Sequence, residues 1–337
     1  MTDQATAAAA PATGIGHYRA SERTLWDTYG LAPSERFVEL DRPRARLRIL
    51  EVGSGPPVLL SHGTIGPGGW ASLVGRLAGH RALELDRPGW GMSDPVDLPR
   101  TGMRPFVGDV LAGTLDKLGL ERVDIVGGSI GNTWALSLAE HHPDRVGRVV
   151  LLGGGPLVDT VAVPSSIGRI ASPIGWLIVR LKMDRARLES ILRASGHGAG
   201  LAAGRIPDAF IEWRRSAHND TAAMRHERAL IRQVVRGSGW RAGITFDDAA
   251  LGAIGAPVLL VYGTADPTGD VATWRAFTAA LPNGSLQVID GAGHMPWFDD
   301  PARVASLVDR FLLPPPATDI EPLGAAYSGR SRSAGPT

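Results

Sequence analysis

Three side chains whose types suit nucleophilic catalysis each follow a predicted strand of this sequence. Ser129 stands in a G-x-S-x-G run, Asp266 follows a late apolar run, and His294 follows the last one. A serine hydroxyl becomes a nucleophile when a histidine removes its proton, and a carboxylate can orient that histidine and stabilise its charged form. The three residues therefore predict acyl-transfer chemistry, provided that the fold brings them together.

The segment around Ser129 has the pattern of a strand that turns sharply into a helix. Residues 123–126 predict the strand, and residues 130–141 predict a helix that opens directly after the serine. Gly127 and Gly131 let strand and helix approach without a Cβ clash, and a strained turn holds the hydroxyl clear of the sheet. The alternative is a tight turn that carries an ordinary serine.

Three acids compete as the partner of the histidine. Asp266 lies at the C-terminal end of a predicted strand, which suits a buried orienting carboxylate, although a turn or a helix cap is the alternative. Asp270 is better placed to cap the next helix. Asp159 lies beyond the sixth predicted strand, from which three glycines and a proline separate it. We therefore predict that Asp266 orients the histidine.

Two histidines stand where strands end in glycine-rich loops. His294 is the only one of nine that follows a late strand in such a loop, which gives it a flexible support over a serine. His62 ends an early strand, and we expect its ring to brace the loop that follows. That loop, GTIGPGG, lacks both glycine patterns that cradle nucleotide phosphates, so it does not predict a nucleotide site.

Short apolar runs alternate with longer amphipathic segments through most of the chain. Buried strands separated by helices favour an α/β fold with a mostly parallel sheet covered on both faces. The first two strands have no helix between them, which allows an antiparallel edge. The predicted strands span 36–40, 46–52, 58–61, 82–85, 123–126, 149–152, 258–262 and 285–289. The predicted helices span 70–77, 105–118, 130–141, 271–281 and 301–311.

The alternation stops after the sixth predicted strand and resumes before the seventh. Residues 156–250 are mostly helical in pattern, and we predict that they form a cap over the C-terminal strand ends. The cap would divide the core into residues 21–155 and 251–313. Residues 1–20 and 314–337 lack periodicity, and we expect them to be disordered tails.

These segments, taken in order, resemble the α/β-hydrolase fold superfamily in its cap-bearing bacterial branch. The resemblance covers about residues 36–313 and rests on the order Ser129, Asp266, His294 and on the DRPGWGMS run that starts at Asp86. It implies an eight-stranded sheet and a Ser-His-Asp triad that needs no metal and no organic cofactor.

The resemblance also implies roles for the residues that flank the serine. The backbone N–H groups of Thr64 and Ile130 would form an oxyanion hole. His62, Gly63, Gly127 and Gly131 would shape the site without reacting.

The implied activity is that of a serine hydrolase, of the carboxylic ester hydrolase type, that acts on a small apolar substrate. A serine nucleophile argues against haloalkane dehalogenases and epoxide hydrolases, and Gly128, which stands where many lipases have histidine, argues against a lipase. Three alternatives stay open. They are a cofactor-free perhydrolase or haloperoxidase-like enzyme, a C–C bond hydrolase or lyase, and a ligand-binding descendant without activity.

Composition limits the remaining possibilities. The chain of 337 residues has no cysteine, so it has neither disulfides nor Cys-ligated zinc. A net charge of +1 gives no case for nucleic acid, and no segment reads as a signal peptide or a membrane span. We therefore expect a cytoplasmic protein without membrane insertion, whose partner is a small-molecule substrate; oligomeric state is not encoded in any pattern. We expect Arg180, Arg214, Arg215 and Arg225 to lie on solvated faces.

Overall fold

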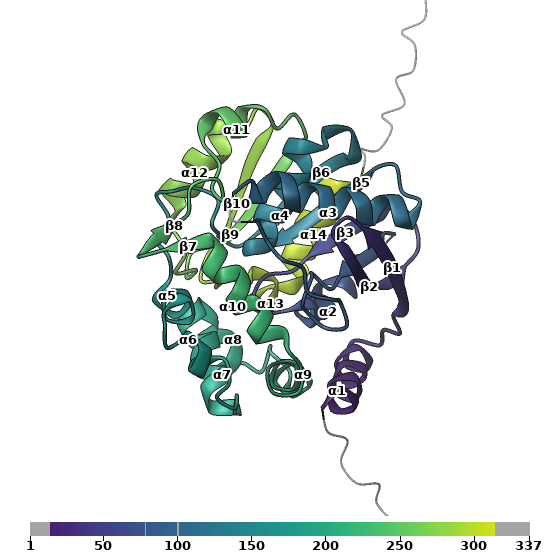
Figure 1. Cartoon of the computed structure of the whole chain (residues 1–337), viewed down its shortest axis with the longest axis vertical. Coiled ribbons are helices and arrows are strands. Elements are labelled where there is room, and N and C mark those ends of the chain that lie inside the picture. The colour runs from purple at the N-terminus through teal and green to yellow at the C-terminus, as the bar shows by residue number, and fades with distance from the viewer. Residues whose placement is uncertain (1–13, 78, 100, 314–337) are drawn as a thin grey trace, which may run out of the picture.

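An eight-stranded sheet forms the centre of the protein, with the strand order β1-β2-β4-β3-β5-β6-β9-β10 (Figure 1). The computed structural model describes residues 14–313 except 78 and 100. β2 runs antiparallel to both β1 and β4, and all other pairs in this sheet are parallel. The strands are β1 Ser34–Asp41, β2 Arg44–Gly53, β3 Pro57–Ser61, β4 Arg81–Leu85, β5 Val123–Gly128, β6 Val146–Leu152, β9 Val258–Gly263 and β10 Gly284–Ile289. The predicted α/β class and all eight predicted strands are confirmed.

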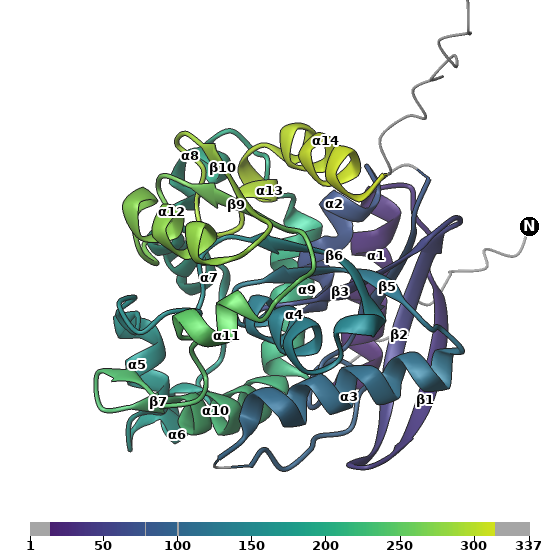
Figure 2. The ribbon, with the colours of Figure 1, turned by 90° about the horizontal axis from the view of Figure 1, so that it is seen from above.

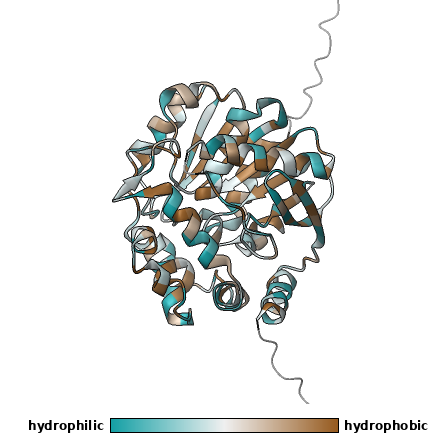
Figure 3. Cartoon of the chain, viewed as in Figure 1, coloured by the Kyte–Doolittle hydropathy of each residue, from teal (hydrophilic) through white to brown (hydrophobic). Residues whose placement is uncertain are grey.

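Helices cover both faces of this sheet, because successive side chains of each strand point to opposite faces. Leu59 belongs to a core with α3 and α4, and its neighbour Leu60 belongs to a second core with α1, α2 and α14. Figure 2 shows the two helical layers on either side of the strands, and Figure 3 shows the apolar character of the central strands. The helices that flank the sheet are α1 Ile15–Thr28, α2 Ala71–Val74, α3 Met103–Leu118, α4 Ile130–His141, α12 Val271–Ala280, α13 Pro296–Asp299 and α14 Pro301–Leu312.

An insertion between β6 and β9 carries the remaining helices. It lies against the loops that follow β3, β4 and β10, at the C-terminal edge of the parallel strands. Its elements are α5 Ser165–Ala171, α6 Gly175–Ile178, α7 Arg185–Leu192, α8 Gly198–Ala202, α9 Asp208–Asn219, α10 Ala223–Val234, a hairpin of β7 Val235–Arg236 and β8 Gly239–Trp240, and α11 Asp248–Gly252. Among the described residues, no helix is long and apolar enough to cross a membrane.

Two predicted segments differ from the structure. Residues 15–20, which we predicted as part of a disordered tail, form the first turns of α1, because the stripe that starts at Tyr18 and Ser21 is buried against the core. The helix predicted over 70–77 is instead a 3₁₀ turn, Pro67–Trp70, followed by the short α2, which ends before Gly75. Residues 1–13 of the predicted N-terminal tail and the predicted C-terminal tail, 314–337, lie outside the described residues.

A buried arginine ties α1 to the sheet. Arg48 on β2 is 1% exposed and binds both oxygens of Glu22 on α1, at 2.6 and 2.8 Å. Its Nε also donates to Asp86, the residue that follows β4, at 2.6 Å. Asp86 therefore pairs with Arg48 and not with its neighbour Arg87. The interaction fixes the start of the DRPGWGMS loop relative to the N-terminal helix.

We expect Arg48→Ala to lower the free energy of unfolding by about 3–5 kcal/mol, because it leaves two buried carboxylates without their cation. Arg44→Ala is the matched control, since Arg44 is exposed on the same strand. Urea denaturation of both variants measures the difference. A loss from Arg48→Ala no larger than that of the control would show that the pairing contributes little.

Candidate active site

Ser129 stands at a strained turn between β5 and α4. Its φ of 56° is the only positive φ of a non-glycine among the described residues, and this conformation costs about 1–3 kcal/mol. Close backbone approach explains the glycines beside it. A Cβ on Gly131 would lie 2.0 Å from the carbonyl oxygen of Ser61, and one on Gly127 would lie 2.6 Å from the carbonyl oxygen of Gly131.

The structure brings Ser129, His294 and Asp266 into one hydrogen-bonded chain. His294 Nε2 lies 3.0 Å from Ser129 Oγ, and His294 Nδ1 lies 3.0 Å from both carboxylate oxygens of Asp266. The N–H groups of Gly154 and Thr268 each donate to Asp266 at 2.8 Å, and the Thr268 hydroxyl donates at 2.5 Å. The carboxylate is therefore held in one orientation from the loops after β6 and β9.

Asp266 and His294 each shift the pKa of the other toward its charged form. Burial by itself raises the pKa of Asp266, but His294 and the hydrogen bonds outweigh it and lower that pKa overall. Burial by itself lowers the pKa of His294, but the charge and hydrogen bond of Asp266 raise it above the ordinary 6.5. The pair therefore favours an imidazolium against a carboxylate, which is the state that proton transfer from Ser129 would produce.

The loop after β3 packs directly against the serine. A Cβ on Gly63 would lie 2.7 Å from Ser129 Cβ, so only glycine fits there. The His62 ring contacts the Gly63 carbonyl oxygen through Nδ1 at 2.7 Å, and its Nε2 accepts from the Arg87 N–H at 3.1 Å. Burial, together with Arg87, holds the pKa of His62 well below its usual range, so the ring is neutral. His62 thus joins two loops, and among the described residues its ring makes no hydrogen bond to Ser129.

Thr64 and Ile130, the two predicted oxyanion-hole residues, belong to the two backbone segments that meet at Ser129. Thr64 follows the Gly63 that abuts Ser129, and Ile130 opens α4 directly after it. Over the described part of the chain, neither backbone N–H donates a hydrogen bond to another residue. Both donors are available to a ligand.

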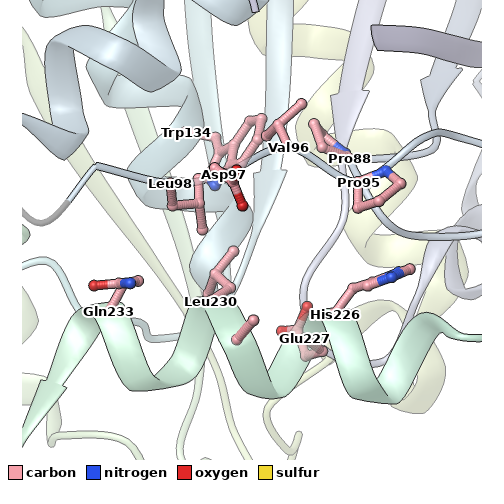
Figure 4. A pocket seen from close by; sticks show the side chains of 11 residues that line it. Pro88, Pro95, Val96, Asp97, Leu98, Trp134, His226, Glu227, Leu230 and Gln233 are labelled. Atoms are coloured by element: carbon pink, nitrogen blue, oxygen red, sulfur yellow. The ribbon is translucent and has the colours of Figure 1, made fainter.

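A buried glutamate of the insertion holds the Thr64 side chain. Glu227 on α10 is 1% exposed and accepts from Thr64 Oγ1 at 2.8 Å, from Trp90 Nε1 at 2.6 Å and from Arg87 at 3.2 Å. Glu227 also lines a cavity of about 170 Å³ between α10 and Trp134 of α4 (Figure 4). The lining of this cavity includes none of the three residues of the hydrogen-bonded chain.

The prediction that Arg214 lies on a solvated face is wrong. Arg214 is 5% exposed on α9, not solvated, and it donates to the Thr64 carbonyl oxygen at 3.4 Å. Its Nε and Nη1 are buried and have no hydrogen-bond partner in the described chain. Burial lowers the pKa of Arg214 to about 10, while Glu227 opposes that shift. A cation with two unused donors therefore lies beside the loop that contacts Ser129.

The loop that carries His294 is fixed by the insertion. The N–H of Gly293 donates to Asp299 at 2.9 Å, that of His294 to the Ser195 carbonyl at 2.9 Å, and that of Met295 to His197 Nε2 at 3.2 Å. His197 is fully buried, and its Nδ1 lies 2.7 Å from Asp299. Three successive amides are thereby held, two of them by residues of the insertion.

The competing acids have other partners. Asp270 caps α12 by accepting from the Thr273 N–H at 2.7 Å, as predicted, and Asp159 accepts from the Thr245 hydroxyl. Among the described residues, no group of three or more His, Cys, Asp or Glu side chains is arranged to hold a metal ion.

Sequence reasoning missed Glu227 and His197. Glu227 is one acid in an arginine-rich helix, and the partners that reveal its role lie 137 to 163 residues away. His197 stands in a glycine-rich segment of the insertion and contacts residues about 100 positions later. Neither residue has a local pattern that indicates its contacts.

The chain belongs to the alpha/beta hydrolase family, whose sequence model matches residues 58–307. A 2-hydroxy-6-oxononadienedioate/2-hydroxy-6-oxononatrienedioate hydrolase from Cupriavidus pinatubonensis is 30% identical to it over 298 residues, which cover 83% of this chain and 96% of that protein. A second hydrolase of that name, from Pseudomonas putida, is 30% identical over 291 residues, covering 83% and 97%.

Solved structures of low identity share the fold. Naproxen esterase from Bacillus subtilis superposes with a TM-score of 0.68 at 18% identity, over 88% of this chain and 98% of that one. The 2-hydroxy-6-oxo-6-phenylhexa-2,4-dienoate hydrolase from Rhodococcus sp. strain RHA1 gives 0.66 at 20% identity, over 83% and 98%. The predicted superfamily is confirmed, and the family is one of hydrolases.

We expect Asp266→Asn to lower the pKa of His294. The Asp266 carboxylate is what raises that pKa, so without its charge the burial of the ring favours the neutral form. An NMR titration of the His294 ring should give a midpoint above 6.5 in the wild type and a lower one in the variant. Asp270→Asn, which removes an exposed capping carboxylate, should leave the midpoint unchanged; an equal shift in this control would contradict the pairing.

Proposed function

We propose that this protein is a serine hydrolase that acts on a carbonyl substrate bearing a carboxylate. The observation that carries the proposal is the chain Ser129–His294–Asp266, with both hydrogen bonds at 3.0 Å. Serine is the nucleophile, His294 is the base, and Asp266 orients the imidazole and stabilises its charged form. Thr64 and Ile130 donate their N–H groups to the oxyanion, an interaction for which each donor typically contributes about 10²–10³ in kcat.

The reaction proceeds in two halves. Ser129 Oγ attacks the carbonyl carbon while its proton passes to His294 Nε2, and the tetrahedral oxyanion forms between the two N–H groups. His294 then gives the proton to the leaving group as the acyl–serine ester forms. Water, activated by the same imidazole, attacks this ester and releases the acid with a free Ser129.

The leaving group decides between two substrate classes. In an ester it is an alkoxide. In a 2-hydroxy-6-oxo dienoate the proton of the 2-hydroxyl first moves to C5, which makes C5 an sp3 carbon. The leaving group is then the C5 carbanion, which the conjugated 2-oxo group stabilises as a dienolate and which takes the proton from His294. We propose the C–C substrate, because two of the relatives at 30% identity, matched over nearly their whole length, bear the name of hydrolases of 2-hydroxy-6-oxononadienedioate and 2-hydroxy-6-oxononatrienedioate. Ester hydrolysis is the second candidate, since the same serine and oxyanion donors serve both leaving groups.

Arg214 supports a substrate that carries a carboxylate. Its unpartnered Nε and Nη1 are the kind of donor that binds a carboxylate in a buried site, and its Nη2 contacts the carbonyl of Thr64. We propose that this guanidinium anchors the dienoate end while the 6-oxo carbon lies at Ser129.

Ser129→Ala tests the nucleophile. We expect kcat to fall by up to about 10⁶ on every substrate that the wild type turns over, because no other group can form the acyl ester. The assay pairs a 2-hydroxy-6-oxo dienoate, followed by its loss of absorbance, with p-nitrophenyl esters of increasing acyl length. Activity retained by Ser129→Ala overturns the whole proposal. A higher kcat/KM on the esters than on the dienoate overturns only the C–C assignment.

Arg214→Gln tests the anchor. We expect KM for the dienoate to rise by about 10–100-fold, because a charge-assisted hydrogen bond is lost, while kcat/KM for a neutral ester stays within about threefold. Arg215→Gln, at the half-exposed neighbour on the same helix, should change neither value. Equal losses of Arg214→Gln on the neutral ester and the dienoate would show that Arg214 supports the fold and does not bind the carboxylate.

A further inference from the structure

Exposed apolar side chains gather on one short stretch of the insertion. Seven large apolar side chains of the described residues are exposed, and four of them lie within the eight residues from Ile174 to Leu181. Their exposed fractions are 62% for Ile174, 53% for Trp176, 48% for Leu177 and 46% for Leu181. An exposed cluster of this kind on a globular protein commonly marks a surface that binds something.

The stretch is anchored on its other side, so the exposure is not that of a loose loop. Gly175, Val179 and Met183 are buried beneath it. Val179 packs in a small core with Trp90 of the DRPGWGMS loop and Met224 of α10. The inward face is thereby fixed to the protein, and the outward face carries the four apolar side chains.

The charged residues of the segment that carries these side chains are all basic. Residues 164–183 contain Arg169, Arg180 and Lys182 and no acid. α10, which packs against α5 and α6 (Figure 1), adds three cations at i, i+3 and i+7 on the side away from Glu227: Arg225, Arg228 and Arg232. None of these six cations pairs with a carboxylate among the residues that the structure describes.

The cations lie close enough to affect one another. Arg228 donates to the Ser172 carbonyl at 3.2 Å, between α5 and α6, and the Arg180 guanidinium lies over the Trp176 ring at 5.5 Å. Partial burial, together with the nearby charges of Arg232 and Arg180, lowers the pKa of Arg228. A positive field is thus concentrated on one face, although the whole chain has a net charge of only +1.

We infer that this face, which we call the cap surface and define as Ile174, Trp176, Leu177 and Leu181 with the six surrounding cations, binds reversibly to an anionic lipid bilayer. Apolar side chains including a tryptophan enter the interfacial layer, and arginine and lysine bind anionic headgroups. A symmetric dimer through the same face would place these cations against their own copies, which disfavours that occupant. The inference does not depend on the proposed reaction.

Flotation of the full chain with vesicles tests the inference. Wild type should bind vesicles of phosphatidylglycerol and phosphatidylcholine in equal parts, bind pure phosphatidylcholine at least about tenfold more weakly, and lose binding in 0.5 M NaCl. Trp176 fluorescence should shift to the blue on binding, although the other tryptophans require Trp176→Phe as the reference for this signal.

Three variants separate the possible outcomes. Arg180→Glu with Lys182→Glu should lower the partition coefficient at least about tenfold, and Trp176→Ser with Leu177→Ser should lower it similarly. Arg23→Glu with Arg44→Glu makes the same charge change at exposed positions elsewhere and should stay within about twofold of wild type. Thermal unfolding identifies any variant that fails to fold.

Two results would overturn the inference. One is equal binding by the cap-surface variants and the control variant. The other is a wild type that binds no anionic vesicle and elutes as a dimer that Trp176→Ser with Leu177→Ser converts to a monomer, since a second copy then covers the face.

Discussion

Crowding of the main chain at Ser129 is the constraint on which the rest of the site depends. Four glycines allow it: a Cβ on Gly63, Gly127, Gly131 or Gly155 would lie within 3 Å of backbone or of the serine itself. The strand order β3-β5-β6 places the loops that carry them side by side. Backbone N–H groups, not side chains, can therefore approach the hydroxyl from two directions, and a strained φ at Ser129 is held by its surroundings.

The insertion between β6 and β9 also contacts the loops around Ser129. Glu227 neutralises part of the charge of Arg87 and binds the side chain of Thr64, so α10 contributes to the geometry of the loop after β3. Arg214 on α9 reaches the carbonyl of the same residue. One short loop thus receives contacts from two helices of the insertion.

Much of the core could be predicted from sequence because its determinants are local. The short apolar runs of the buried central strands and the glycines at the turn after β5 act over a few residues, and so does the capping of α12 by Asp270. The burial of Arg214 has no such local determinant. Adjacent arginines on a helix are typical of a solvated face, whereas the contacts of Arg214 with Thr64 and Trp90 come from distant parts of the chain. α1 was assigned in part to a tail, although the buried stripe through Tyr18, Glu22 and Leu25 has helical spacing.

The net charge of the whole chain does not reveal how unevenly its charged residues are distributed. A net charge near zero argued against anionic partners, yet the acids are distributed away from α5, α6 and the outer side of α10. Charge has to be assigned to surfaces before it predicts a partner, and that assignment requires the fold.

The contacts of His197 and Ser195 have a consequence for how such proteins diversify. Insertions between the sixth strand and the following one vary in length and sequence with little cost where they touch only solvent or each other. Here the segment around Gly196, at a φ of 90°, lies against Ala265 and Gly293, and its flanks bind the amides beside His294. A chimera that exchanged the whole insertion for that of a relative would also exchange the support of the imidazole. An exchanged insertion must therefore keep the contacts that residues 195–197 make with the loop that carries His294.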